Sequence, residues 1–384
     1  MKIAFVSDTL YPYFKGGIET VRHSEMVELA KSHEVYSFSM RFVGMPSHFV
    51  KNRIHHISFG TTDPSLFYRH RRRSITNALK YSFLLPFYLF GHRFDAVEVN
   101  SFPYLHLPAV KVYCALTGCK MIVSVYEVWD QSYWREYLGT LGFLSWIINA
   151  FEKRAVKLGD FFISNSSSTT SKLIKERVPS DKIREFSPVI DMDSIKRYSS
   201  PPGRRAKQVV FAGRLIKEKR LDLWLKSFKS AKSRFPALKG LIIGEGPEEK
   251  SIRAMINDFG LSDSVTLRGF FKDKADLYKS MGRSSLLLNM SEREGLSIIT
   301  LESLALGVPV MLPSYSPIPP EVKDMCIVKD RKDIPSAISD VLKGAKTVSP
   351  DTQKLEIFST SNVIRFYNQV FAKLGLMGNR RKEE

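Results

Sequence analysis

The sequence predicts an α/β protein built from two doubly wound halves of similar size. Three observations indicate this fold class. Short apolar runs, typical of buried parallel strands, recur along the whole chain. Segments with apolar residues at helical spacing separate these runs, and loops that contain glycine follow several of them. The order of strand, loop and helix then starts again after the polar stretch 198–205, which we interpret as a linker.

The first half opens with a strand, a loop and a helix. Residues 2–7 form an apolar run that predicts a buried strand, and the loop 11–17 contains proline and glycine. Apolar residues between Ile18 and Ala30 recur at roughly helical spacing, and residues 35–38 predict the next strand. A doubly wound sheet binds ligands beyond the carboxyl ends of its strands. Further strands are expected at residues 96–99, 121–125 and 161–164.

The second half repeats this order. Residues 209–212 predict a strand, 213–220 a loop, and 221–235 a helix with Leu221, Leu225 and Phe228 on one face. The two halves, joined near residue 195, are expected to hold a substrate in the cleft between them. Further strands are expected at residues 241–243, 265–267 and 286–288.

The net charge of +19 is spread along the chain, with +8 in residues 1–200 and +11 in the remainder. The positive electrostatic field of such a chain attracts nucleic acid, anionic lipid headgroups or phosphorylated substrates. Charge by itself does not choose among these partners, and a merely soluble basic surface explains it too. The sequence has neither a ribonucleoprotein aromatic motif nor zinc-finger spacing, so we do not expect nucleic-acid binding.

Cysteine usage and hydropathy predict a cytoplasmic protein. The three cysteines have no zinc-type spacing, and an odd, sparse count fits a reducing compartment. The N-terminus continues directly into a strand pattern without the features of a signal peptide. No apolar run approaches the ~18 residues of a spanning helix. The two nearest stretches, 81–90 and 138–151, are expected to be long enough only for an interface.

Two glutamates with seven residues between them form the most informative motif. Glu294 precedes Gly295, which allows the backbone to approach a ligand closely at a strand-to-helix turn. The helix that follows would direct free N–H groups at an anion. Glu302, two turns into that helix, can accept hydrogen bonds from a ribose diol. Two glutamates on the exposed face of a surface helix are the plain alternative.

A basic loop follows the strand 209–212. Arg214 offers a rigid fork and Lys219 a mobile point charge, and the pair suits the clamping of a diphosphate. A basic loop that is simply solvated is the alternative. The position of this loop at a strand end, in the same half as the paired glutamates, favours a binding site.

Together these motifs resemble the retaining glycosyltransferases of family 4, the group 1 glycosyl transferases with the GT-B fold. The resemblance extends along nearly the whole chain. Its motifs are Gly16-Gly17-Ile18-Glu19, Ile163–Ser166, Gly213-Arg214 with Lys219, Ile243–Pro247, Gly269 and the paired glutamates.

The resemblance implies two Rossmann-like domains that face a central cleft. Residues 1–194 would bind the acceptor and face a membrane, and residues 195–355 would bind the nucleotide sugar. Residues 356–384 would form a helix that packs back on the first domain, followed by a charged tail. The implied activity is that of a hexosyltransferase. It would move a sugar, with retention, from a nucleoside diphosphate sugar to a lipid-linked or glycan acceptor, without metal or cofactor.

The resemblance also assigns roles to single residues. Arg214 and Lys219 would hold the donor diphosphate, and Glu302 would bind the ribose. The donor sugar would contact Glu294 and the nearby backbone of Gly295, Leu296 and Ser297. Across the cleft, Gly16 and Gly17 would lie beneath the phosphate.

Three positions depart from the family pattern. Tyr126, next to Glu127, stands where members often carry a histidine that touches the donor sugar. A phenol can donate a hydrogen bond to a sugar, but it is not cationic near neutral pH. Tyr126 is therefore either a sugar contact, with Glu127 beside it, or an ordinary wall residue. A catalytically weak, sugar-nucleotide- or lipid-binding partner of another transferase is the alternative function. The other departures are residues 187–191 and 315–321.

One motif points to a metal. Asp191 and Asp193 form an Asp-x-Asp pair, as in metal-dependent transferases. The pair falls at the expected connection between the domains, where the family has a lone aspartate in a turn. Because Arg214 and Lys219 already neutralise a leaving diphosphate, we expect no metal.

The first half also suggests a membrane surface. Basic residues beside aromatic and aliphatic ones are typical of interfacial segments on anionic lipid. We expect the segment 83–90 to insert shallowly, so that the protein is peripheral on the inner face of the cell membrane. A core helix beside a solvated basic face is the alternative. The basic cluster consists of Arg69, Arg71, Arg72 and Arg73.

Overall fold

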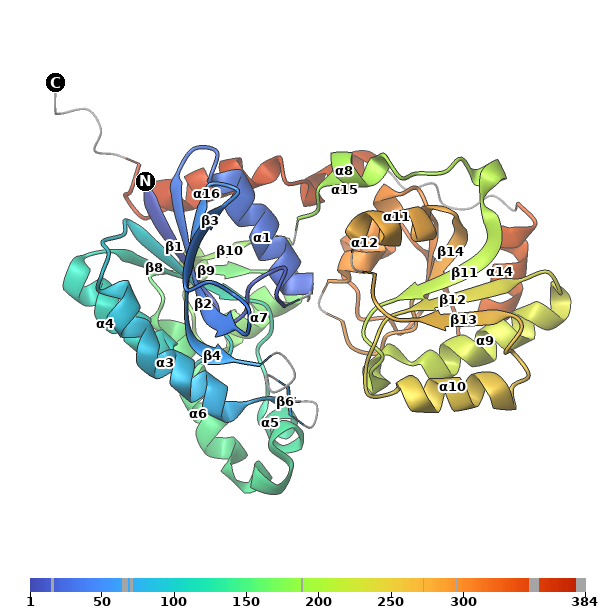
Figure 1. Cartoon of the computed structure of the whole chain (residues 1–384), viewed down its shortest axis with the longest axis horizontal. Coiled ribbons are helices and arrows are strands. Elements are labelled where there is room, and N and C mark those ends of the chain that lie inside the picture. Colours follow the sequence, from blue (N-terminus) through green and yellow to red (C-terminus); the bar gives the residue numbers. More distant parts are fainter. Residues whose placement is uncertain are drawn as a thin grey trace. The chain divides into compact units, whose positions relative to one another are not determined.

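The computed structural model describes residues 1–14, 17–63, 68–69, 72–187, 189–271, 273–294, 296–344 and 352–377. The chain divides into two compact units (Figure 1). Unit 1 comprises Met1–Val189 and the chain from Thr360 onward, and unit 2 comprises Ile190–Ser359. Each unit contains a largely parallel sheet flanked by helices, which confirms the predicted fold class. Unit 2 begins five residues before the expected boundary at residue 195 and ends four residues after residue 355.

The sheet of unit 1 has the strand order β10-β9-β8-β7-β1-β2-β4-β3. All neighbouring strands in it are parallel except β3 and β4. A separate antiparallel pair, β5 and β6, precedes the helix α3. The strands are β1 (Lys2–Val6), β2 (Glu34–Phe42), β3 (His48–Lys51), β4 (Ile54–Thr62), β5 (Tyr68–Arg69), β6 (Arg72–Arg73), β7 (Ala96–Asn100), β8 (Lys120–Val125), β9 (Phe161–Ser164) and β10 (Ile183–Glu185).

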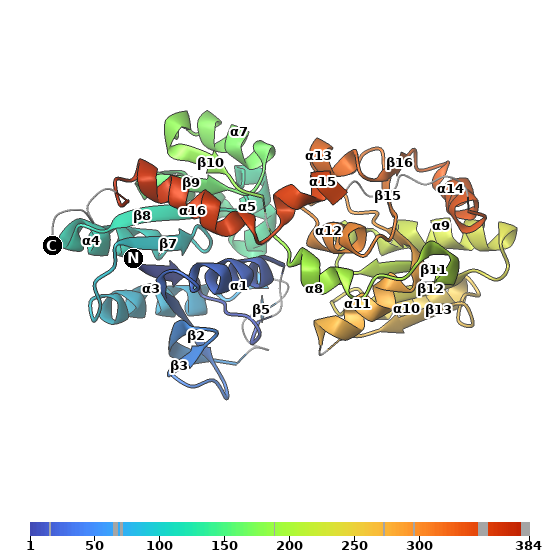
Figure 2. The ribbon, with the colours of Figure 1, turned by 90° about the horizontal axis from the view of Figure 1, so that it is seen from above.

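The helices of unit 1 lie on both faces of this sheet. Helices α1 and α16 are in contact on one face, and α3 and α4 are in contact on the other (Figures 1 and 2). A short 3₁₀ turn, Gly139–Leu144, precedes α6, and another, Val156–Leu158, follows it. The helices are α1 (Gly17–Leu29), α3 (Ile75–Leu89), α4 (Leu107–Thr117), α5 (Gln131–Leu138), α6 (Ser145–Ala155), α7 (Ser167–Lys175) and α16 (Asn362–Lys373).

Helix α16 follows unit 2 in the chain and packs on unit 1. Its apolar face, which includes Val363, Tyr367 and Phe371, is buried in the core of that unit. Phe366 stacks on Phe186 with ring centroids 4.0 Å apart. Burial of several large side chains outweighs the entropy of ordering one short helix, so α16 is held against unit 1.

The sheet of unit 2 is wholly parallel, with the strand order β13-β12-β11-β14-β15-β16. Its strands are β11 (Ala206–Ala212), β12 (Lys239–Ile243), β13 (Val265–Arg268), β14 (Ser284–Leu288), β15 (Val310–Pro313) and β16 (Ile327–Lys329). Its helices are α8 (Met192–Lys196), α9 (Leu221–Arg234), α10 (Glu249–Asp258), α11 (Lys274–Gly282), α12 (Ile298–Ala305), α13 (Pro320–Lys323), α14 (Ile334–Leu342) and α15 (Thr352–Leu355).

Every strand that the sequence predicts is a strand in the structure, whereas β3, β4, β5, β6, β10, β15 and β16 were not predicted. Strand β4 contains His55, His56 and Ser58, so its pattern lacks the apolar continuity of the other central strands. Among the described residues, no helix is both long and apolar enough to cross a bilayer.

Candidate functional site

The two charged segments predicted in the second half meet at one edge of the unit 2 sheet. Lys219, in the turn after β11, forms an ion pair with Glu294, which follows β14. Strands β11 and β14 are parallel neighbours, so the turns that follow their carboxyl ends lie at the same edge of the sheet. The backbone N–H of Glu292 also donates to the carbonyl of Glu218 at 3.0 Å. The Lys219 and Glu294 side chains are only 19% and 12% exposed, which strengthens their mutual attraction.

Arg214 lies in the same turn as Lys219. Its side chain is exposed, and it forms no hydrogen bond or ion pair with the part of the chain that the structure describes. Buried Leu215 holds the turn, because its N–H donates to the carbonyl of Glu245 at 2.9 Å and its carbonyl accepts from the N–H of Glu248 at 3.0 Å. A Cβ atom on Gly246 would lie 2.4 Å from the Leu215 carbonyl oxygen, so this packing requires glycine. Arg214 is thus a cation without a carboxylate partner among the described residues, on a turn that is held by backbone hydrogen bonds.

Glu302, the second glutamate of the pair, is buried in α12 and already has partners. Its Oε1 atom accepts hydrogen bonds from the Tyr278 hydroxyl at 2.8 Å and from Lys274 Nζ at 2.7 Å. Both partners belong to α11, so these contacts connect the two helices. The interpretation of Glu302 as one of two solvent-facing glutamates is therefore wrong. No sequence motif indicated Lys274 or Tyr278.

Ser297 and Leu296, which directly precede α12, are held by contacts within unit 2. Ser297 directly precedes the helix, is fully buried, and accepts a hydrogen bond from Asn289 Nδ2 at 3.2 Å. Leu296 packs against the core of unit 2. The predicted contact at Gly295 lies outside the described residues.

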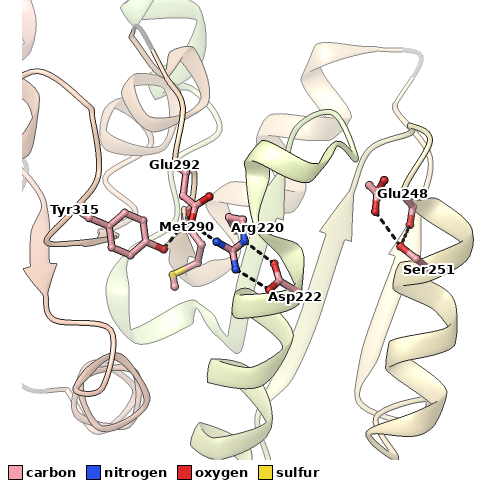
Figure 3. A network of polar contacts seen from close by, with 7 residues as sticks. All are labelled: Arg220, Asp222, Glu248, Ser251, Met290, Glu292 and Tyr315. Atoms are coloured by element: carbon pink, nitrogen blue, oxygen red, sulfur yellow. Dashed lines mark hydrogen bonds and ion pairs between the residues drawn. The ribbon is translucent and has the colours of Figure 1, made fainter. Parts of the chain in front are cut away.

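A second charged network, which the sequence analysis missed, surrounds Arg220 (Figure 3). Its guanidinium forms two 2.9 Å hydrogen bonds with Asp222 and an ion pair with Glu292. The hydrogen bond from Arg220 lowers the pKa of Asp222 below its usual range. Beside them, the Tyr315 hydroxyl donates to the Met290 carbonyl at 3.4 Å. Because its charge is matched by two carboxylates, Arg220 orders this edge rather than offering a free cation.

The corresponding edge of the unit 1 sheet contains Tyr126. Tyr126 lines a small cavity, and burial raises the pKa of its phenol far above neutrality. It is therefore a neutral hydrogen-bonding group. Its neighbour Glu127 is exposed, and the Glu127 carbonyl accepts a hydrogen bond from Tyr104 at 3.3 Å. The cavity is lined by Glu25, Ser124, Val125, Tyr126, Ile163, Asn165, Phe186 and Tyr367.

A buried ion pair lies in the same unit. Arg22 of α1 donates to Glu98 of β7 at 2.8 Å, and the two side chains are 4% and 1% exposed. Ser124 of β8 donates to the same Glu98 oxygen at 2.5 Å. The Tyr367 hydroxyl of α16 donates to the other oxygen. Glu98 therefore links three sequence-distant elements to β7.

Glu25, one turn after Arg22 in α1, completes this network. Burial raises the pKa of its carboxyl to about 8, and the nearby charge of Glu98 acts in the same direction. The sequence analysis missed Arg22, Glu25 and Glu98. A signal existed at Glu98, because it is an acidic residue inside an otherwise apolar buried strand.

The predicted glycines after β1 are only partly described. Gly17 is exposed and opens α1, whereas Gly16 lies outside the described residues. Thr9 donates to Glu19 in the first turn of α1 at 2.9 Å. This contact fixes the start of the helix against the end of β1.

The Asp-x-Asp pair has a structural role at Asp191. Its side chain caps α8, accepting from the Ser194 N–H at 3.1 Å and from the Ser194 hydroxyl at 2.6 Å. Asp193 lies in the first turn of that helix. The described residues contain no group of three or more His, Cys, Asp or Glu that could hold a metal ion.

The residues predicted to contact a membrane are described unevenly. Arg69 belongs to β5, and Arg72 and Arg73 form β6, but the structure describes only their backbone. Arg71 lies outside the described residues. The segment 83–90 belongs largely to α3, where buried and exposed positions alternate around the helix.

Two family models match the chain. The model described as Glycosyltransferase Family 4 matches residues 15–194. The model described as Glycosyl transferases group 1 matches residues 194–346. Together they extend over both units of the structure.

Curated relatives show lower but clear similarity. WcaL of Escherichia coli (strain K12), named as a colanic acid biosynthesis glycosyltransferase, is 26% identical over 170 residues, which are 42% of this chain and 41% of WcaL. The GDP-mannose-dependent alpha-(1-6)-phosphatidylinositol monomannoside mannosyltransferase of Mycolicibacterium smegmatis is 26% identical over 163 residues, 38% of this chain and 42% of the relative. The chain thus spans about two fifths of the length of these relatives.

Solved structures share the fold over the full chain. Anabaena Alr3699/HepE, crystallised in complex with UDP and glucose, aligns with a TM-score of 0.71 over 97% of this chain and 100% of that chain, at 13% identity. The two doubly wound sheets therefore form a GT-B fold.

Proposed function

Because the chain belongs to the family 4, group 1 glycosyltransferases of the GT-B fold, we propose that it is a retaining, metal-independent hexosyltransferase. Its donor is a nucleoside diphosphate sugar, and its acceptor is a hydroxyl group of a lipid-linked or glycan molecule. Such a reaction belongs to polysaccharide or lipid-linked oligosaccharide biosynthesis. The enzyme works as a peripheral protein at the inner face of the cell membrane.

The observation that carries the proposal is the arrangement of Arg214, Lys219 and Glu294 at one sheet edge. Arg214 is exposed and has no carboxylate partner in the part of the chain that the structure describes, and Lys219 lies on the same turn. A departing diphosphate develops negative charge, and cations already in place stabilise that charge without reorganisation. Two cations on one turn therefore suit the leaving group of a nucleotide sugar.

The Lys219–Glu294 ion pair suggests how donor binding changes the site. A diphosphate that reaches Lys219 competes with Glu294 for the same ammonium group. Once released, the carboxylate of Glu294 is a free acceptor for sugar hydroxyls. Donor binding would thus turn an internal ion pair into two substrate contacts. Glu302, with its remaining acceptor capacity, and the backbone of Leu296 and Ser297 complete the donor site.

The proposed chemistry needs no side-chain base. The leaving diphosphate itself accepts the proton of the acceptor hydroxyl, so that transfer occurs on the face of the sugar that the diphosphate leaves. Tyr126, a neutral phenol, donates a hydrogen bond rather than acting as an acid or base near neutral pH. Positioning by the protein then supplies much of the remaining rate enhancement.

The relatives support the acceptor class only by analogy. The Mycolicibacterium smegmatis relative is named for a phosphatidylinositol monomannoside acceptor, and the Anabaena structure contains UDP and glucose. We extend a nucleotide-sugar donor and a lipid or glycan acceptor to this chain on that basis.

A second candidate function is supported by Tyr126. A neutral phenol where family members often carry histidine fits a catalytically weak, sugar-nucleotide- or lipid-binding partner of another transferase. The buried network of Arg22, Glu25 and Glu98 lies in the same unit and would be retained in such a partner.

One experiment separates the two functions. The full chain is incubated with a panel of UDP-, GDP-, ADP- and dTDP-sugars, and release of the nucleoside diphosphate is measured with and without lipid-linked acceptors. Release that depends on the acceptor, with a product of retained anomeric configuration by NMR, supports the transferase. Thermal stabilisation by a nucleotide sugar without any release supports the binding partner instead.

A further inference from the structure

Exposed apolar side chains gather on one part of unit 1, beginning with helix α3. This helix buries Tyr81, Leu85 and Leu89 against the sheet. Its opposite side also consists of large apolar residues, and Phe83 and Phe87 are 71% and 69% exposed. A helix that has large apolar residues on its exposed side as well as on its buried side can place the exposed ones in a second apolar environment.

The neighbouring segments extend this apolar surface. On α4, which contacts α3, Leu116 is 71% exposed and Val112 is also exposed. On the turn and helix 139–155, Phe143 and Trp146 are exposed too. We refer to Leu79, Phe83, Phe87, Val112, Leu116, Phe143, Trp146 and Ile147 as the apolar face.

The sheet topology places these segments on the same side of unit 1. Helices α3, α4 and α6 each connect strands while the chain moves in one direction across the sheet, from β4 through β7 and β8 to β9. Right-handed crossovers then put all three helices on one face of the sheet. Helix α1 connects β1 to β2 in the opposite direction and lies on the other face with α16 (Figure 1).

The rest of the described chain does not show such a concentration. In unit 2, the large apolar residues that are exposed among those described are Phe270, Tyr315, Val328 and Ile357, which come from separate segments. Scattered apolar residues are normal on a soluble surface, whereas a contiguous patch marks an interaction site. The apolar face is therefore a candidate binding surface.

The charged residues on and beside the apolar face indicate which kind of partner it binds. Helix α3 contains a single charged residue, Lys80, and helix α4 contains a single one, Lys111. Residues 139–151 contain none, and the exposed charges that follow are Lys153 and Arg154. Lys111 is paired with Asp160 and Lys153 with Glu176. Lys80 and Arg154 are exposed and bond only backbone carbonyls among the described residues, so they border the large apolar side chains as cations without a carboxylate partner there. This combination is typical of a surface that lies in an interface with anionic lipid.

We propose that the apolar face docks unit 1 onto a lipid bilayer that contains anionic headgroups. The rings of Phe83, Phe87 and Trp146 enter the boundary between headgroups and acyl chains, and Lys80 and Arg154 contact the headgroups. The inference rests on the proposed function only for its expectation of an acceptor at a membrane. It differs from the sequence prediction in one respect, because apolar insertion rather than the arginine cluster provides most of the attachment.

Vesicle flotation of the full chain tests this proposal directly. Vesicles of phosphatidylcholine with 30% phosphatidylglycerol are compared with phosphatidylcholine alone, at low salt and at 0.5 M salt. We expect binding to the anionic vesicles that is reduced but retained at high salt, because screening weakens charge attraction and leaves apolar insertion intact. Binding that vanishes at high salt would instead assign attachment to basic residues alone.

Two sets of substitutions localise the contact. Phe83→Gln, Phe87→Gln and Leu116→Gln together are expected to lower the vesicle partition coefficient at least ten-fold. The matched control, Val43→Gln with Val50→Gln, changes two exposed apolar residues of other segments and is expected to leave it unchanged. Circular dichroism and Tm verify that both proteins are folded, as expected for substitutions at exposed positions.

Trp146 provides a reporter that does not depend on affinity. Trp134 and Trp224 are buried and Trp129 is partly buried against the core of unit 1, whereas Trp146 is exposed. Trp146 should therefore account for most of a lipid-induced blue shift in fluorescence and for quenching by brominated lipid. Trp146→Phe should abolish most of this signal while flotation persists. A full blue shift in Trp146→Phe would show that another surface enters the lipid.

The remaining outcomes overturn the proposal. If wild type ignores both kinds of vesicle, or if the triple variant binds as wild type does, the apolar face is not a lipid-docking surface. If sedimentation shows a dimer that the triple variant loses, the face binds a second copy of the chain. Because flotation needs no donor, a protein that binds vesicles but releases no nucleoside diphosphate refutes the proposed function and leaves this inference standing.

Discussion

The carboxyl edges of the two sheets hold their charges in opposite ways. In unit 2, Lys219 and Glu294 are partly exposed, and Arg214 is exposed without a partner among the described residues. In unit 1, Arg22 and Glu98 are almost completely buried, and Ser124 and a tyrosine of α16 bond the same carboxylate. One edge can therefore exchange its partners for a substrate, whereas the other cannot without leaving a charge buried.

Solvent access explains this difference. The Lys219–Glu294 pair keeps some contact with solvent, so an incoming anion or water can replace one partner at a lower cost than in a fully buried pair. Removing one partner of a buried pair leaves an uncompensated charge in a medium of low polarity. We therefore assign binding and catalysis to the charges of unit 2, and a structural role to those of unit 1. The predictions below test this assignment.

The largest expected effect is on stability in unit 1. Arg22→Leu leaves Glu98 buried without its cation, and we expect a loss of about 3–5 kcal/mol in the free energy of unfolding. The matched substitution Arg214→Leu should change it by less than ~0.5 kcal/mol, because Arg214 is exposed. Hydrogen–deuterium exchange measures the stability of each unit separately, with peptides from β1 and β7 for unit 1 and from β11 for unit 2. Equal effects of the two substitutions would remove the distinction between the edges.

The next largest effect is on turnover in unit 2. Arg214→Ala and Lys219→Ala each remove a cation that faces the leaving diphosphate, which should cost about 2–4 kcal/mol in the transition state, or roughly 30- to 1000-fold in kcat/KM. Lys217→Ala, an exposed neighbour on the same turn, serves as control and should retain activity. Near wild-type kcat/KM in either test variant would show that the diphosphate binds elsewhere.

The pH dependence of stability should come partly from Glu25. Its pKa is about 8 in the folded chain against an ordinary value of 4.5, so the native state holds the extra proton between these values. Stability from this group is therefore fully present below pH 4.5 and is lost as pH rises toward 8. We expect Glu25→Gln to raise Tm relative to wild type, and by more at pH 8 than at pH 5.

Glu28→Gln is the control for the pH experiment. Glu28 lies on the same helix, but its partner Lys31 is exposed, so its substitution should shift Tm little at either pH. A difference between Glu25→Gln and wild type that shrinks as pH rises would contradict the assigned direction of the pKa shift.

The smallest expected effect is that of a chelator. Asp191 caps α8. In the proposed function, Arg214 and Lys219 supply the positive charge that a metal would otherwise bring. Turnover should be unchanged within error after EDTA treatment, and Asp193→Asn should be active. Complete loss of turnover in EDTA, with recovery on adding Mg²⁺ or Mn²⁺, would show that a metal ion, rather than Arg214 and Lys219, stabilises the leaving diphosphate.

Local patterns predicted the unit 2 site better than the unit 1 site. Arg214, Lys219 and Glu294 follow directly after strands that the sequence predicts, and a parallel sheet necessarily brings such loops to one edge. Lys274 escaped prediction because nothing near it in the sequence marks it as the partner of Glu302. Arg220 escaped because its role depends on Glu292, 72 residues away.

By itself, the sequence determined the two doubly wound halves, the positions of most strands, and the loops that carry Arg214, Lys219 and Glu294. These features depend on short-range periodicity and on the rule that parallel strands share a carboxyl edge. Tertiary structure alone decided which charges are buried and which are free. Arg22 and Glu98 are 76 residues apart, and the burial of both follows from α1 packing on β7. The tertiary structure also decided which side of α3 is exposed. Both sides contain large apolar residues, and only the packing shows which side is buried in the core.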